Sequence, residues 1–141
     1  MLCWRITVMD FEAVVEAVRR GVERATAMGI KVAIVVVDGS RLPVFVYRMA
    51  GSYQFAQDVA LRKAITVAYF KRASGELAER AAQNLPLYLG LTIHEGLIFG
   101  KGGLLVFKDG ALVAAVGVSG GTGDQDEEVA KVVAGALQRS L

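Results

Sequence analysis

The sequence predicts an α+β domain in which one antiparallel sheet is flanked by helices. Two pairs of short apolar segments are each joined by a glycine-containing turn, at 38–41 and at 108–110. Asp-Gly between apolar segments is typical of a β-hairpin, because glycine readily adopts the positive φ that the turn needs. The helical segments flank these hairpins instead of joining parallel strands, so the sheet should be antiparallel, with the order α-β-β-α-α-β-β-α.

The first helix and the first hairpin occupy the N-terminal third of the chain. Asp10 is expected to cap a helix with apolar residues at helical spacing, and Gly29 to end it in a left-handed conformation. The segment Val32–Val37 is short, unbroken and β-branched, which predicts a strand covered on both faces. The returning strand should run from Val44 to Arg48.

The middle of the chain predicts two helices and one irregular segment. A helix should run from about Tyr53 to Arg72, and a shorter one from Ser74 to about Gln83. The longer helix carries a stripe of small residues that permits close packing on the sheet or on a partner helix: Ala56, Ala60 and Ala64. Proline and glycine interrupt Leu85–Gly100, which favours an irregular loop, with a short helix or an edge strand within it as alternatives.

The C-terminal segment predicts a hairpin, a glycine-rich loop and a last helix from about Asp124 to Arg139. Asp124 is expected to be the N-cap, with Glu127 three residues later. A glycine-rich loop before a helix can bind phosphate, but the acidic residues at this helix start would repel an anion. The spacing also matches neither the dinucleotide nor the P-loop pattern, so the loop is interpreted as structural.

Composition limits the function classes. The chain has 141 residues, which suits a single domain spanning 1–141, and a net charge of +2, which does not favour nucleic acid. The longest apolar run is too short to cross a bilayer, and the start of the chain lacks the pattern of a signal peptide, so no membrane association and a cytoplasmic location are expected. The single cysteine, Cys3, excludes an intramolecular disulfide.

The chain is unusually apolar for its size, with a mean hydropathy of +0.44. We interpret the excess as a subunit interface or a ligand cleft, and therefore expect a homo-oligomer.

His94 is the only histidine in the chain. A catalytic triad needs a nucleophile beside its base, and a zinc site needs several ligands, so neither is favoured here. Two interpretations stay open: an exposed loop histidine without a role, or an axial ligand to a haem iron or a corrinoid cobalt, for which one imidazole is enough.

A lysine interrupts an apolar stripe on the second helix. The stripe falls within about 80° of arc at 100° per residue and consists of Phe55, Val59, Lys63, Thr66 and Phe70. Either the ammonium of Lys63 reaches water while its stem lies along the stripe, or Lys63 and Thr66 face a cleft and meet a carboxylate or a polar ligand edge. Arg48 could add a second cation there, and a planar apolar ligand with propionates would suit such a cleft.

Several motifs, in order along nearly the whole chain, resemble the GlcG/HbpS family, which is also found as the C-terminal domain of PduO-type proteins. They are Val36–Gly39, Arg48–Gly51, Ala60–Ala68, Gly102–Gly103, Gly117–Gly120 and Gly123–Glu127. The resemblance implies a profilin-like antiparallel sheet flanked by helices, often in closed oligomers, with haem or corrinoid binding in some members.

The same resemblance assigns positions to individual residues. Lys63 and Thr66 fall in the helix motif, whereas the C-terminal glycines and Asp126 are expected to be architectural. The first helix lacks the histidine that some family members carry, so iron ligation would fall to another residue. The candidates are His94, Tyr88, Met49 and Thr66.

Three functional hypotheses follow. The first is an oligomeric binding protein for haem or a related tetrapyrrole or corrinoid, with Lys63, Thr66, Arg48 and Phe70 at the ligand and His94 on the metal. The second is an enzyme acting on haem or on a small organic acid, although no catalytic constellation is visible. The third is an accessory subunit without a ligand.

Overall fold

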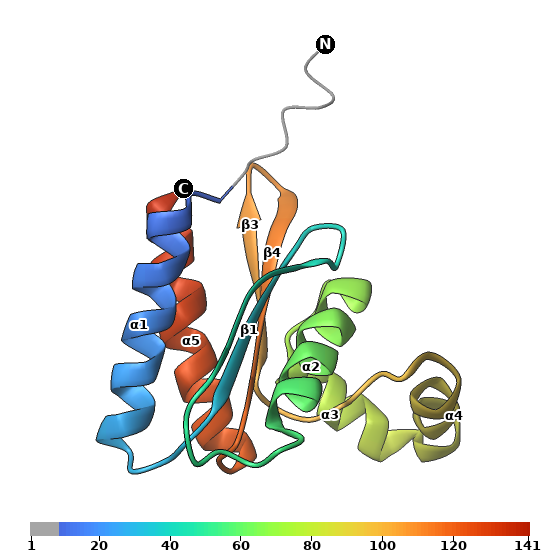
Figure 1. Cartoon of the computed structure of the whole chain (residues 1–141). Helices are drawn as coiled ribbons and strands as arrows, with labels where there is room; N and C mark the ends of the chain where they lie inside the picture. Colours follow the sequence, from blue (N-terminus) through green and yellow to red (C-terminus); the bar gives the residue numbers. More distant parts are fainter. Residues whose placement is uncertain (1–8) are drawn as a thin grey trace.

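The computed structural model describes residues 9–141. They form one four-stranded antiparallel sheet, in the order β2-β1-β4-β3, with helices on both faces (Figure 1). The helices are α1 Phe11–Ala27, α2 Ala56–Phe70, α3 Ser74–Gln83, α4 Leu85–Glu95 and α5 Gly123–Ser140, and the strands are β1 Ala33–Asp38, β2 Pro43–Arg48, β3 Gly103–Lys108 and β4 Ala111–Ser119. The expected α+β class and both hairpins are confirmed. Cys3, on which the disulfide argument depends, lies outside the described residues.

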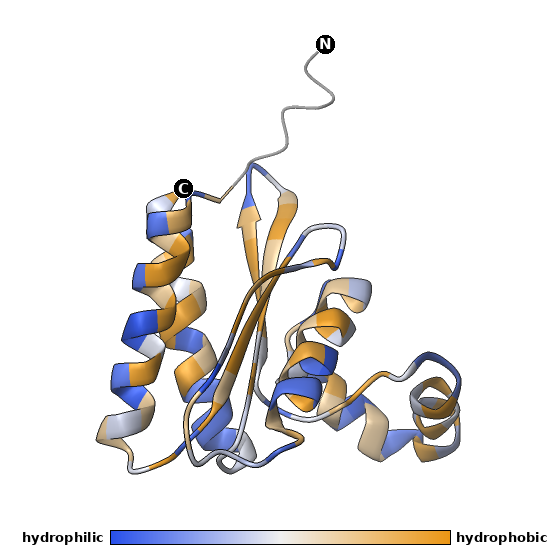
Figure 2. Ribbon diagram, viewed as in Figure 1, coloured by the Kyte–Doolittle hydropathy of each residue, from blue (hydrophilic) through white to orange (hydrophobic). Residues whose placement is uncertain are grey.

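The first strand is the centre of the core, as its sequence predicts. Ile34 and Val36 face α1 and α5, whereas Ala33, Val35 and Val37 face α2. All five side chains are fully buried. Figure 2 shows the apolar strands enclosed between helices that turn many hydrophilic residues outward. Burial on both faces explains why this segment shows no alternation of apolar and polar residues.

The alanine stripe of α2 packs on the sheet. Ala56, Ala60 and Ala64 are fully buried against β1 and β4. A Cβ placed on Gly117 of β4 would lie 1.9 Å from the carbonyl oxygen of Ala60, so the helix backbone touches the strand backbone at this point. The sheet, not a partner helix, is therefore what the small residues contact.

Two sequence predictions need a correction in their local detail. The segment expected to be an irregular loop, with a short helix as one alternative, is mostly the helix α4, whose first turn tolerates Pro86 because the N–H groups of a first turn need no helical partner. The N-cap of α5 is Thr122, not Asp124, and Thr122 forms a capping box with Gln125. Asp124 instead accepts a hydrogen bond from Lys101 at 2.7 Å.

Helix α4 stands apart from the rest of the fold (Figure 1). None of its residues is buried, and it projects from the end of α3. Gly96 ends it with a φ of +69°, a conformation that glycine adopts without strain. In the part of the chain from 9 to 141, no helix combines the length and the apolar character needed to cross a membrane.

Candidate ligand-binding site

An apolar hollow lies between the C-terminal end of α2 and α4. Its volume is about 320 Å³, and it is lined by Tyr69, Phe70, Leu91, Glu95 and Leu97. Ligand sites usually occupy roughly 300–1,000 Å³ and are mostly apolar with few polar groups. This hollow is mostly apolar, with Glu95 as its charged residue, and its volume is near the lower end of that range. We call it the α2–α4 hollow.

Three aromatic rings fix α4 to the body of the protein beside this hollow. The ring of Tyr88 lies 6.3 Å from that of Phe70 and 4.8 Å from that of Phe99. The rings of Phe70 and Phe99 meet edge to face at 5.8 Å. Such pairs contribute about 0.5–1.5 kcal/mol each beyond the area they bury. Phe70, expected at a ligand, therefore lines the hollow and also holds one of its walls.

Thr66 positions the segment that follows α4. Its hydroxyl donates to the carbonyl of Arg62 at 2.6 Å and accepts from the N–H of Ile98 at 3.0 Å. The residue is only 1% exposed. Thr66 thus holds the chain next to Leu97 in place and does not itself line the hollow.

Lys63 lies in the interior, not beside the hollow. Its ammonium donates to the carbonyl of Val118 at 2.9 Å and to Oδ2 of Asp126 at 3.0 Å, and the residue is 6% exposed. The interpretation in which the ammonium reaches water is therefore wrong. Lys63 does meet a carboxylate, but this carboxylate belongs to its own chain.

Asp126 joins three parts of the fold. Besides its contact with Lys63 of α2, its Oδ1 accepts from the N–H of Gly121 at 2.8 Å, in the loop between β4 and α5. Burial raises the pKa of Asp126, against the opposing effects of the Lys63 ammonium and of the Gly121 and Gly120 amides. Asp126 therefore has a structural role, as expected, and its ion-pair partner Lys63 has a structural role as well.

His94 lies at the rim of the structure on α4. Its side chain is 84% exposed, and Nδ1 lies 3.0 Å from Oε1 of Glu95, which lines the hollow. A hydrogen bond on Nδ1 orients the imidazole and leaves Nε2 as the nitrogen that could bind a metal. His94 is therefore next to the hollow but does not line it.

The other candidate residues lie elsewhere. Arg48 ends β2 and is not among the residues that line the hollow. Met49 is 6% exposed, and its sulfur accepts from the N–H of Val32 at 3.4 Å, which occupies it in the core. Of the residues expected at a ligand, the structure thus brings Phe70 and Tyr88 together, whereas His94 shares the helix α4 with Tyr88 and contacts Glu95.

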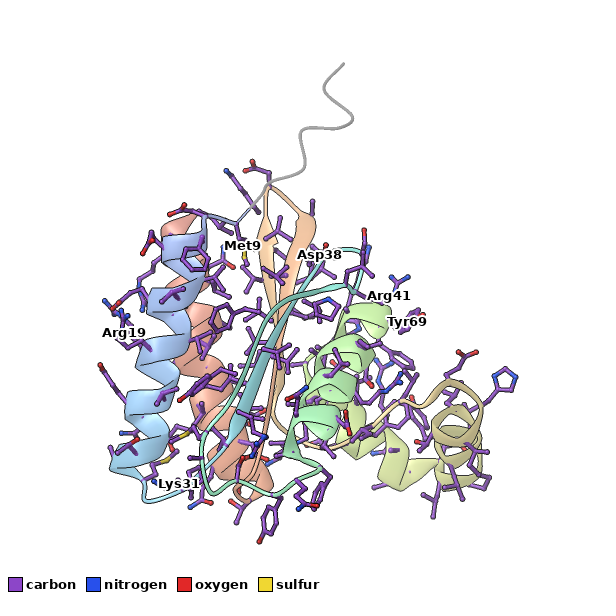
Figure 3. All side chains as sticks on the ribbon, in the orientation of Figure 1. Met9, Arg19, Lys31, Asp38, Arg41 and Tyr69 are labelled. Carbon is purple, nitrogen blue, oxygen red and sulfur yellow. The ribbon has the colours of Figure 1, made fainter. Side chains whose placement is uncertain are left out.

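Sequence reasoning missed Leu91 and Glu95 because it considered a short helix in this segment only as an alternative. Together with Tyr88, which it did name, these residues are spaced i, i+3, i+7, which places all three on one face of α4, and the contact of Tyr88 with Phe70 turns this face toward α2. It also missed Arg41, whose guanidinium carbon lies 4.1 Å from the ring centroid of Tyr69 (Figure 3). This stacked cation stands beside one wall of the hollow.

A second hollow lies between α1 and β2. Its volume is about 280 Å³, and its lining is again apolar, except for Arg19: Val15, Val18, Arg19, Val22, Phe45 and Tyr47. We call it the α1–β2 groove. It contains no histidine, cysteine or carboxylate, and residues 9–141 hold no cluster of such side chains that could bind a metal ion.

The residues of the α2–α4 hollow fit a haem better than those of the groove. Porphyrin faces need apolar and aromatic walls, which Phe70, Leu91 and Leu97 provide. Haem iron needs an axial ligand, and the only histidine, His94, follows the lining face of α4 next to Glu95 without lining the hollow itself. Propionates need a cation, and Arg41 is stacked on the lining residue Tyr69. The α1–β2 groove has a cation and aromatic residues in its own lining, namely Arg19, Phe45 and Tyr47, but no histidine, and this difference is what favours the α2–α4 hollow.

The chain is thus a small layered α+β domain with an apolar hollow between α2 and α4. Residues 9–134 match the family model described as "Haem degrading protein HbpS-like", so the chain belongs to this family.

Solved structures of family members share the fold. A PduOC:heme complex superposes with a TM-score of 0.83 at 27% identity, covering 92% of this chain and 94% of that one. Streptomyces reticuli HbpS, solved as a double mutant, gives a TM-score of 0.81 at 36% identity, with 91% and 86% covered. The Klebsiella pneumoniae protein ORFY, assigned to DUF336, gives 0.83 at 27% identity, with 91% and 89% covered.

Curated relatives include the corrinoid adenosyltransferase PduO of Salmonella typhimurium. It is 30% identical over 132 residues, which are 92% of this chain and 39% of that protein. This chain therefore spans about two fifths of the length of that relative. A 15.0 kDa Citrobacter freundii protein from the dhaT-dhaS intergenic region is 31% identical over 109 residues, 77% of each chain.

Proposed function

We propose that this protein binds haem, or a related tetrapyrrole, in the α2–α4 hollow and does so as a homo-oligomer. The observation that carries the proposal is the aromatic wall formed by Phe70, Tyr88 and Phe99 beside the single histidine-bearing helix of the described chain. A family relative solved as a heme complex supports the ligand class. A relative named as a corrinoid adenosyltransferase keeps a corrinoid as the second candidate ligand.

Each group would have a distinct role at such a ligand. The faces of Phe70, Leu91 and Leu97 would exclude water from one side of the macrocycle. His94 would bind the metal through Nε2 while Glu95 holds Nδ1. Arg41 would neutralise a propionate. When bound, haem would supply an iron centre whose reactivity depends on its axial ligand and on the burial of the site.

A matched pair of variants tests the location of this site. Leu91→Asn and Val15→Asn each place an amide in one hollow, and both positions are partly buried on a helix. Burying a leucine side chain contributes about 1.5–3 kcal/mol, so we expect Leu91→Asn to weaken hemin binding roughly tenfold or more. Val15→Asn should leave affinity unchanged. The measurement is a titration of the purified protein with hemin, followed by the Soret band.

His94→Ala separates ligation from apolar binding. We expect this variant to shift the Soret and visible bands while most of the affinity stays, because the apolar walls are intact. An unchanged spectrum in His94→Ala would exclude His94 as the axial ligand. Weaker binding in Val15→Asn than in Leu91→Asn would show that the ligand sits elsewhere.

A further inference from the structure

The two edges of the sheet differ in how they are protected. On β3, the side-chain amide of Gln138 donates to the carbonyl of Phe107 at 2.6 Å, and its oxygen accepts from the N–H of Phe107 at 3.3 Å. The hydroxyl of Ser74 likewise accepts from the N–H groups of Gly102 and Gly103, just before and at the start of β3. Side chains thus form hydrogen bonds with backbone groups of β3 and of the residue before it, which hinders another strand from pairing with this edge of the sheet.

Among residues 9–141, no side chain hydrogen-bonds to the outer backbone groups of β2 in the same way. Five of its six residues are exposed, and Pro43–Tyr47 contains no charged side chain. Val44 and Val46 are 45% and 40% exposed, although Val46 lies beside the fully buried Val35 of β1. Natural edge strands are usually shielded by lysine, by proline, by bulges or by covering elements. In β2 the proline, Pro43, and the irregular pairing opposite Val37 lie at the first end of the strand only. The stretch from Val44 to Tyr47 is therefore an apolar edge to which another strand can add.

The direction of the backbone groups on β2 follows from its pairing with β1. The N–H of Met49 donates to the carbonyl of Val32, so Met49 turns its backbone groups toward β1. Backbone direction alternates along a strand, so Tyr47 and Phe45 also turn theirs inward. Val46 and Arg48 consequently turn their N–H and C=O groups away from the sheet, where another strand could pair with them.

We infer that β2 pairs with β2 of a second copy of this chain, antiparallel, with Val46 on the two-fold axis. This specifies the interface of the homo-oligomer in the proposed function and rests on that oligomer. A two-fold contact needs one self-complementary patch. An antiparallel strand centred on Val46 meets this need, because each Val46 would exchange both of its backbone hydrogen bonds with its copy and the two sheets would become continuous.

The area exposed along this edge suits such a contact. Exposed aromatic residues lie on β2 and in the segment that follows it, namely Tyr47 and the stacked pair Tyr53 and Phe55. At about 150–250 Å² for a whole aromatic side chain, their exposed parts offer roughly 300 Å². That is somewhat under half of the ~800 Å² that each partner buries in a standard interface. Leu42, Val44, Val46 and the strand backbone can supply the remainder.

Substitutions at Val46 test the pairing directly. Val46→Pro removes an outward N–H and no bond to β1, and Val46→Lys places two ammonium groups together at the two-fold axis. We expect both to halve the mass measured by light scattering after size exclusion, with the thermal midpoint serving as the check on folding. Val46→Thr keeps the branched shape and the N–H and should retain the wild-type mass. Ile93→Lys, on the exposed face of α4, should retain it too.

Cross-linking gives an independent readout. Val46→Cys in a Cys3→Ser background should be joined into a covalent dimer by a short thiol-reactive bifunctional cross-linker, because the two Cβ atoms of a directly opposed, hydrogen-bonded pair lie only about 5.5 Å apart. A wild-type monomer at every concentration would overturn both the oligomer and this interface. An oligomer that persists in Val46→Lys, or that is lost in Ile93→Lys, would overturn this interface alone. Hemin binding by the monomeric Val46→Lys variant would show that the α2–α4 hollow works within one subunit.

Discussion

At the scale of residues, the stripe on α2 contains side chains with two different roles: some form hydrogen bonds inside the fold, and one lines the hollow. Lys63 and Thr66 both lie on the stripe expected to face a ligand, yet each is occupied within the chain, by Asp126 and by Ile98. Only Phe70, at the end of the stripe, reaches the α2–α4 hollow. A charged residue in an apolar stripe therefore marked a buried ion pair here. Its partner was 63 positions away, and no local pattern in the sequence could have identified it.

Truncation of Asp126 tests how much this junction contributes. We expect Asp126→Ala to lower the free energy of unfolding by about 3–5 kcal/mol, because it leaves the buried Lys63 ammonium and the Gly121 amide without their acceptor. Asp124→Ala, on the same first turn of α5, removes only an exposed contact with Lys101 and should change stability little. Urea unfolding measures both, and equal losses would contradict the assigned role of Asp126.

At the scale of elements, segments with strong periodicity or turn chemistry were predictable and α4 was not. The strand β1, the hairpin turn at Asp109–Gly110 and the helix α3 follow from local sequence alone. Proline and glycine inside α4 concealed a helix whose stability comes from the aromatic contacts of Tyr88 with α2 and with Phe99. Since those contacts are tertiary, intrinsic propensity could not reveal them. The candidate site was missed largely for the same reason.

Two glycine substitutions test the packing of these elements. Gly117→Ala would drive a methyl group into the backbone of Ala60, and we expect it to destabilise the fold by about 1–3 kcal/mol or more. Gly90→Ala, in α4, meets open space and should stabilise the helix by about 0.5–1 kcal/mol. Thermal unfolding compares them. A neutral Gly117→Ala would mean that α2 does not contact β4 as closely as the structure shows.

At the scale of the whole molecule, the fold class and the division into two packed faces were predictable because burial periodicity repeats along the chain. The high apolar content was also informative, since the core alone does not absorb it. Large apolar side chains remain exposed on β2 and α4. The arrangement of these exposed side chains was not predictable from the sequence. The exposed residues of β2 lie along an edge of the sheet, and those of α4 lie on the helix beside the α2–α4 hollow.

The central claim is that the ligand binds between α2 and α4, and paramagnetic broadening of backbone amide signals by hemin tests it most directly. Ferric haem broadens the signals of nearby nuclei, so two-dimensional NMR spectra recorded during a hemin titration report where it sits. We expect the amide signals of Phe70, Leu91 and Leu97 to disappear first, while those of Val15 and Val22 in the α1–β2 groove persist. Early loss of the groove signals with the α2–α4 signals intact would contradict the claim.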